Sequence, residues 1–140
     1  ATHGEWVRIA RAELEPDTAA VVDHVLGEAD RVDAAWDALA REDRAAFGAA
    51  MNASHASLAG HCGVSHPRLD ALVSRAREVG ADGARLTGAG FGVCIVALTS
   101  EDGVAKVIAE LEAANRSAGF DATEAPVFRA RPGAGAGIRY

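Results

Sequence analysis

The sequence of 140 residues has only two cysteines, Cys62 and Cys94, and few basic residues. Two cysteines among small and apolar neighbours exclude a fold built on disulfides. The 14 lysines and arginines face 20 aspartates and glutamates, and the net charge of −6 argues against a nucleic-acid-binding face, which needs clustered basic residues. No apolar run reaches the length of a membrane span, and no charged-then-apolar leader is present. These absences favour a soluble, cytoplasmic protein that binds neither nucleic acid nor membrane.

Apolar side chains, by contrast, are abundant. Hydrophobic residues make up 49% of the chain, which is enough to build a core, and 140 residues fit one domain of ordinary size. We therefore expect a single domain over 1–140. It divides into a helical part (1–64), an α-β-β-α-β part (65–132) and a tail (133–140).

The first half has the apolar periodicity of helices. A short helix is expected to end before Pro16, because proline disfavours helical geometry in the residue before it. Apolar residues then recur at three- and four-residue steps over 22–39, which predicts one long helix with an N-cap at Asp17 or Thr18. Asp43 is the predicted N-cap of a third helix.

The second half alternates between helices and strands. We expect helices over 65–79 and 100–118 and strands over 84–87, 91–99 and 124–131. The second strand is apolar at nearly every position, which is typical of a strand buried on both faces. This order indicates an α+β fold with a small antiparallel sheet. It matches most of a ferredoxin-like unit whose first strand is missing or supplied from elsewhere.

The glycine-rich stretch "TGAGFGVC" (87–94) joins the first two of these strands. Glycine permits positive φ and leaves backbone N–H groups uncovered, so such a loop can wrap a phosphate. A phosphate cradle normally precedes a helix, whereas a strand follows here, which favours a simple hairpin turn. Arg85 and Thr87 flank the loop, and their polarity fits both a solvated strand and contact with a phosphate.

Four possible metal ligands lie close in sequence: His55, His61, Cys62 and His66. Their spacing fits no standard zinc pattern, so we predict no metal site. His55 is expected to pack or form hydrogen bonds on the third helix beside Ser54. Cys94 is expected to be a small buried residue.

Several segments occur in the order and spacing found in one enzyme family. They are "MNASHASL" (51–58), "SHPRLDALV" (65–73), "GARLTGAGFGVCIVAL" (83–98) and "FRARP" (128–132). Together they resemble the C-terminal domain of galactokinases, which are members of the GHMP small-molecule kinase family. The stretch 13–32 also resembles the helix that precedes these segments in that family. The resemblance thus covers nearly the whole chain.

The resemblance implies a ferredoxin-like GHMP kinase C-terminal domain with an extra N-terminal helical segment. Galactokinases transfer the γ-phosphoryl group of ATP to the 1-hydroxyl of galactose. In the family the catalytic aspartate, the ATP loop and most ATP and Mg²⁺ contacts belong to an N-terminal domain, whose motifs this sequence lacks. We therefore expect no catalytic residue here, an N-terminal GHMP kinase domain as partner, and no activity of this chain alone. The alternative is a standalone binding or protein-interaction module without kinase activity.

The resemblance also assigns site residues. The family's glycine hairpin lines the nucleotide-phosphate site, so the predicted phosphate-proximal loop is Thr87, Gly88, Ala89, Gly90, Phe91 and Gly92. The predicted cleft residues are Ser54, His55 and Arg85. This chain has Ala89 and Val93 where the family pattern prefers glycine. We further expect the isolated domain to self-associate, because its cleft face and an unpaired sheet edge would meet water.

Overall fold

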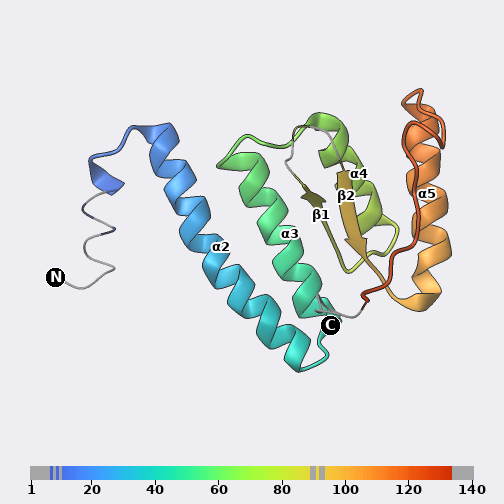
Figure 1. Ribbon diagram of the computed structural model, residues 1–140, viewed down its shortest axis with the longest axis horizontal. Helices are drawn as coiled ribbons and strands as arrows, with labels where there is room; N and C mark the ends of the chain where they lie inside the picture. The colour runs from blue at the N-terminus through green and yellow to red at the C-terminus, as the bar shows by residue number, and fades with distance from the viewer. Residues whose placement is uncertain (1–6, 8, 10, 89–90, 92–93, 134–140) are drawn as a thin grey trace, which may run out of the picture.

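The computed structural model describes residues 7, 9, 11–88, 91 and 94–133 of the chain. The elements run in the order α2 (Pro16–Ala40), α3 (Arg44–Gly60), α4 (Pro67–Glu78), β1 (Gly83–Thr87), β2 (Cys94–Leu98), the 3₁₀ turn η1 (Glu101–Gly103) and α5 (Val104–Ser117). Figure 1 shows α2 and α3 side by side, with the two strands, α4 and α5 following beyond α3. This is the α+β arrangement that the sequence predicts.

Local signals set most of the helix ends. Asp43 is the N-cap of α3, as predicted, and its side chain accepts a hydrogen bond from the Ala46 N–H at 2.9 Å. After α4, Gly80 adopts a φ of 111°, which a residue with a side chain rarely adopts. The N-cap predicted for α2 is wrong: Glu15 occupies that position without a side-chain cap, and Pro16 starts the helix. Proline suits this place because it has no N–H to leave unpaired.

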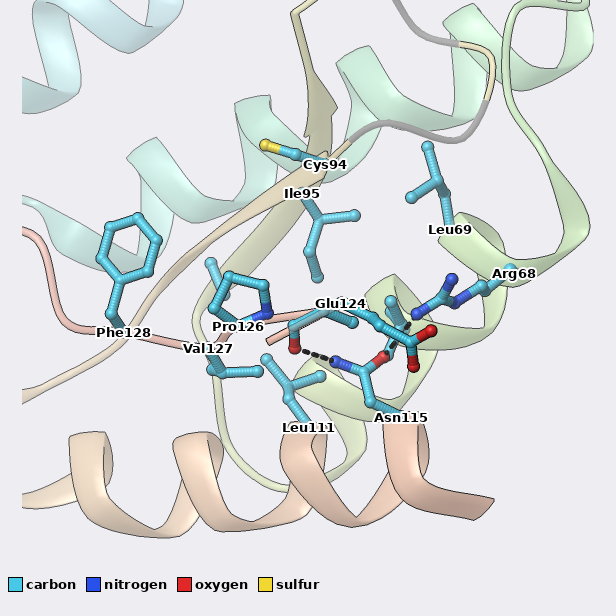
Figure 2. A pocket seen from close by; sticks show the side chains of 13 residues that line it. Arg68, Leu69, Cys94, Ile95, Leu111, Asn115, Glu124, Pro126, Val127 and Phe128 are labelled. Atoms are coloured by element: carbon cyan, nitrogen blue, oxygen red, sulfur yellow. Dashed lines mark hydrogen bonds between the residues drawn. The ribbon is translucent and has the colours of Figure 1, made fainter. Parts of the chain in front are cut away.

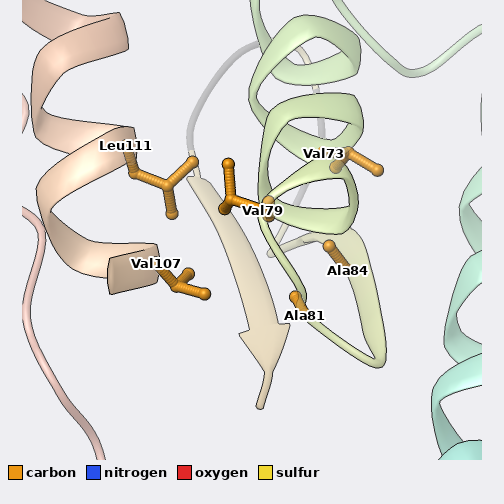
Figure 3. Packing of buried hydrophobic residues seen from close by; sticks show 7 residues of the cluster. Val73, Val79, Ala81, Ala84, Val107 and Leu111 are labelled. Carbon is orange, nitrogen blue, oxygen red and sulfur yellow. The ribbon is translucent and has the colours of Figure 1, made fainter. Parts of the chain in front are cut away.

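The core lies where α4 and α5 pack against β1 and β2. Its buried members are Val73, Ala76, Val79, Ala81, Ala84, Val107 and Leu111 (Figure 3). The strands form an antiparallel hairpin in which Arg85 pairs with Val96 and Thr87 with Cys94. The second half of the chain therefore carries the hydrophobic core.

The prediction that the second strand is buried on both faces is wrong for β2. Cys94 is exposed, contrary to expectation, and Val96 is 44% exposed. The physical reason is that successive side chains of a strand point to opposite faces, and it is Ile95 and Ala97, on the face opposite Cys94 and Val96, that pack against the core. Within the described part of the chain the sheet has two strands only, and no other strand pairs with the far side of β2.

The prediction of a third strand over 124–131 is wrong, because no residue in this range lies in a strand. The segment nevertheless contributes an apolar side chain to the core and a backbone carbonyl to a contact with α5. Val127 packs against the core, and the Asn115 side-chain amide donates to the Ala125 carbonyl at 3.1 Å. The segment therefore packs beside α5 but pairs with neither β1 nor β2, which are the two strands of the described sheet.

Helix α2 packs on α3 but buries little of its own surface. Ala38 is the only buried residue among its 25 positions, and α2 packs on α3. Val25, Val32, Trp36 and Leu39 are all exposed, although they are apolar. Within the described ranges, no helix is long and apolar enough to span a bilayer.

Candidate functional site

Helix α3 lies unusually close to β1 because two glycines meet there. A Cβ on Gly83 would lie 2.5 Å from both the Cα and the carbonyl oxygen of Gly48. A Cβ on Gly48 would in turn lie 2.4 Å from the Asp82 carbonyl oxygen. Only glycine at both positions permits this approach, which brings the next turns of α3 within hydrogen-bonding distance of the strand.

Two side chains of α3 bind the outer edge of β1. Asn52 accepts from the Ala84 N–H at 2.9 Å and donates to the Asp82 carbonyl at 3.2 Å. One turn further along, the Nδ1 atom of His55 accepts from the Leu86 N–H at 3.2 Å. Residues 48, 52 and 55 are spaced four and three apart and so share one face of the helix. This face completes the edge of β1 in place of another strand.

His55 also connects the strand to α4. Since its Nδ1 accepts a backbone N–H, the neutral ring carries its proton on Nε2. That Nε2 lies 3.2 Å from the Asp70 carboxylate, which also accepts a hydrogen bond from the Ser65 hydroxyl. His55 is buried, so the contact fixes its ring between three elements. In this arrangement His55 positions the hairpin.

Ser54 and Arg85 meet at Glu28, a residue that no sequence motif singles out. The Glu28 carboxylate accepts from Ser54 at 2.6 Å, from Arg31 at 2.8 Å and from Arg85 at 3.3 Å. Burial acts to raise the pKa of Glu28. The hydrogen bonds from Ser54 and Arg31, with the charges of Arg31 and Arg85, outweigh it and hold the pKa below its ordinary value. Arg85 also donates to the Leu86 carbonyl at 3.1 Å.

The described part of the predicted phosphate-proximal loop has an unusual backbone. Gly88 has a φ of 80° and Phe91 a φ of 57°, which is uncommon for a residue with a side chain. The Phe91 N–H donates to the Val64 carbonyl at 2.8 Å, while the residue is 73% exposed. This bond ties the hairpin to the α3–α4 connection. Of the predicted loop residues, Ala89, Gly90 and Gly92 lie outside the described residues, as does Val93.

The structure therefore joins the three predicted cleft residues to the glycine hairpin through one framework. Ser54 and Arg85 meet at Glu28, and His55 binds the backbone one residue before Thr87. Sequence reasoning missed Glu28, Asn52 and Asp70. For Asn52 a signal existed, since it stands on the same helix face as His55 inside "MNASHASL". Asp70 lies inside the motif "SHPRLDALV", but nothing in the sequence pointed to its contact with His55, and for Glu28 the partners Ser54 and Arg85 are distant in sequence.

The residues described do not form a metal centre. Among them, no group of three His, Cys, Asp or Glu side chains is placed to hold an ion. His61 shares the Ser57 hydroxyl with His24, and the His66 ring accepts from the Arg68 N–H at the start of α4.

Comparison with known proteins places this arrangement in a family. Residues 35–117 match the profile described as GHMP kinases C terminal, which is more than half of the chain. The chain belongs to the GHMP kinase C-terminal family, as its motifs indicate.

Within that family the chain is similar to galactokinases. It is 39% identical over 122 residues to a galactokinase of Streptomyces coelicolor, covering 87% of this chain and 31% of that protein. It is 44% identical over 103 residues to a galactokinase of Actinobacillus succinogenes, covering 69% of this chain and 26% of that protein. The crystal structure of Lactococcus lactis galactokinase complexed with galactose superposes with a TM-score of 0.75 at 29% identity, covering 86% of this chain and 32% of that one. The chain spans about a quarter to a third of the length of these relatives.

Proposed function

We propose that this chain is the C-terminal domain of a galactokinase-type sugar kinase, which converts ATP and galactose to galactose 1-phosphate. The observation that carries the proposal is the glycine hairpin, which α3 holds through His55. The hairpin and this part of α3 carry the segments that resemble galactokinases, and the chain is similar to galactokinases over most of its length. Dependence on ATP supports a cytoplasmic location for the whole protein.

In this proposal the chain supplies one wall of the active site. The α3 side chains Asn52 and His55 fix β1, and β1 positions the hairpin beside the transferred phosphate. Glu28 neutralises Arg85 and holds it against the strand, so that Arg85 supports the wall. Phosphoryl transfer depends on positioning and charge stabilisation together. The galactose contacts, the nucleotide loop and the Mg²⁺ ligands are assigned to an N-terminal GHMP kinase domain.

A reconstitution assay tests this function. The 140-residue chain alone, with ATP, Mg²⁺ and galactose in a coupled ADP assay, is expected to show no turnover, because it lacks the catalytic aspartate and the ATP loop. The polypeptide that joins it to an N-terminal galactokinase domain should phosphorylate galactose. Turnover by the 140 residues alone would contradict the division of labour. A joined polypeptide that folds but phosphorylates no sugar would support a standalone binding module instead.

A further inference from the structure

Two backbone hydrogen bonds hold the described part of the glycine hairpin to the helices. Just before the loop, the Leu86 N–H donates to the Nδ1 atom of His55 on α3 at 3.2 Å. Within the loop, the Phe91 N–H donates to the Val64 carbonyl, in the connection between α3 and α4, at 2.8 Å. These two holding points therefore set where the hairpin lies relative to α3 and α4.

Both holding points are linked to one carboxylate, that of Asp70 in the first turn of α4. The Nε2 atom of His55 lies 3.2 Å from the Oδ1 atom of Asp70. The Ser65 hydroxyl donates a hydrogen bond to the same Oδ1 atom. Ser65 follows Val64 directly, so the Val64 carbonyl belongs to the peptide unit that joins these two residues. A single carboxylate oxygen is thus connected to each of the two groups that hold the hairpin.

The start of α4 gives Asp70 an anchored support. Leu69 is only 2% exposed, and the Arg68 guanidinium donates to the side-chain oxygen of Asn115 on α5 at 3.2 Å (Figure 2). The same guanidinium lies 3.3 Å from the centre of the Phe120 ring, as in a cation–π contact. Groups carried by a packed helix are held more precisely than groups on a loop. Asp70 therefore has a fixed position from which it can hold its partners.

We propose that Asp70 is a positioning residue for the glycine hairpin, acting through His55 on β1 and through Ser65 on the loop. Removal of the carboxylate would leave the Nε2–H of the buried His55 ring without the oxygen that lies against it, and it would also release the Ser65 side chain. Both holding points would then loosen together. The effect on catalysis rests on the proposed function, in which the hairpin lies beside the transferred phosphate. In such a site a misplacement of about 1 Å can cost about 100-fold in rate.

Amide hydrogen exchange in the 140-residue chain tests these links without any need for activity. The amides of Leu86 and Phe91 report on the two holding points. The Ala84 amide is the internal reference, because it donates to Asn52 on the same edge of β1. In Asp70→Ala, exchange at Leu86 and Phe91 should accelerate at least about 10-fold more than exchange at Ala84. An equal acceleration of all three amides, which a general loss of stability would produce, or no acceleration at all, would overturn the proposal.

Two further variants separate the links from each other. Asp70→Asn keeps a side-chain oxygen that can accept from both neighbours, so exchange at Leu86 and Phe91 should stay within about 3-fold of the parent. Ser65→Ala removes only the link to the loop, so the Phe91 amide should accelerate while the Leu86 amide should not. The proposal is wrong if Asp70→Asn behaves like Asp70→Ala, or if Ser65→Ala affects Leu86 as strongly as Phe91.

Galactose phosphorylation by the full-length polypeptide is scored separately. Asp70→Ala should lower kcat/KM for ATP by about 10- to 100-fold and leave KM for galactose within about 2-fold, because the hairpin faces the phosphate and not the sugar. Val107→Ala, which removes buried side-chain volume from α5, is the control for lost stability and should keep both constants at a temperature where it is folded.

The two measurements distinguish the two proposals. If the parent is active and Asp70→Ala leaves kcat/KM for ATP unchanged although the amides accelerate as expected, the catalytic part of the inference is refuted. If the parent phosphorylates no sugar, the proposed function is refuted, and the exchange rates alone then decide whether Asp70 positions the hairpin.

Discussion

Substitution of Gly83 by alanine tests the close approach that positions α3 on β1. The new Cβ would lie 2.5 Å from two backbone atoms of Gly48, a distance that requires the helix and the strand to separate. Overpacking of this kind costs about 1–3 kcal/mol. Separation also stretches the hydrogen bonds that the Ala84 N–H donates to Asn52 and the Leu86 N–H donates to His55, each worth about 1 kcal/mol.

We therefore expect Gly83→Ala to lower the free energy of unfolding by about 3 kcal/mol, which corresponds to a fall in Tm of roughly 6–12 °C for a chain of this size. Urea unfolding followed by circular dichroism measures it. Gly60→Ala is the matched control: it lies in α3, and a Cβ added there would meet no heavy atom within 4 Å. Its unfolding free energy should stay within about 0.5 kcal/mol of the parent or rise slightly.

A second glycine provides an internal check on the mechanism. Gly48→Ala should be destabilising for the same reason, since its Cβ would meet the backbone of Asp82. Once one alanine has separated the two elements, the other should cost less, so the double variant should lose less stability than the sum of the single ones. A Gly83→Ala protein as stable as the parent, or strictly additive losses, would refute the argument that this contact requires glycine.

Three further predictions concern the site. In the full-length protein, for which we propose kinase activity, Gly90→Val should reduce that activity sharply because it removes a glycine from the glycine-rich loop, whereas Val93→Gly should preserve or raise it. Equal kcat/KM for Gly90→Val and the parent would refute the proposed role of the loop. Glu28→Gln should destabilise the chain near neutral pH. Because the pKa of Glu28 is lowered in the folded chain, its contribution to the free energy of unfolding is present above the unfolded pKa of about 4.3 and is lost as pH falls through the folded pKa. The unfolding free energies of parent and variant should therefore become equal in acid. A difference between them that does not change with pH would contradict this. Phe91→Asp should reduce self-association of the 140-residue chain at high concentration, because Phe91 is an exposed aromatic; light scattering that shows a monomer for both proteins would contradict it.

The helices and the hairpin could be predicted from the sequence because local chemistry specifies them. Asp43 caps α3 with its own side chain, and Gly80 and Gly119 end α4 and α5 with positive φ. The turn after Thr87 was also predictable from its glycines. These features depend on neighbours a few residues away, which a reader of the sequence can see.

Features that depend on distant partners could not be predicted. The strand pattern of 124–131 is real, but a strand also needs a neighbour, and no described strand pairs with this segment. The apolar run in β2 suggested burial on both sides, although only one side is covered. Glu28 is the clearest case, because its partners Ser54 and Arg85 lie 26 and 57 residues further along the chain.

The sparse burial of α2 has a consequence for how the chain opens. With Ala38 as its only buried side chain, α2 can detach from α3 without exposing the core between α4, α5 and the sheet. Such a segment opens at a much lower free energy than the whole domain, and a protease encounters it first. Limited digestion should thus cut within α2 and leave a resistant product that starts near α3. The most stable cooperative unit of the described chain is then α3 together with the elements that follow it, with α2 as a separable layer.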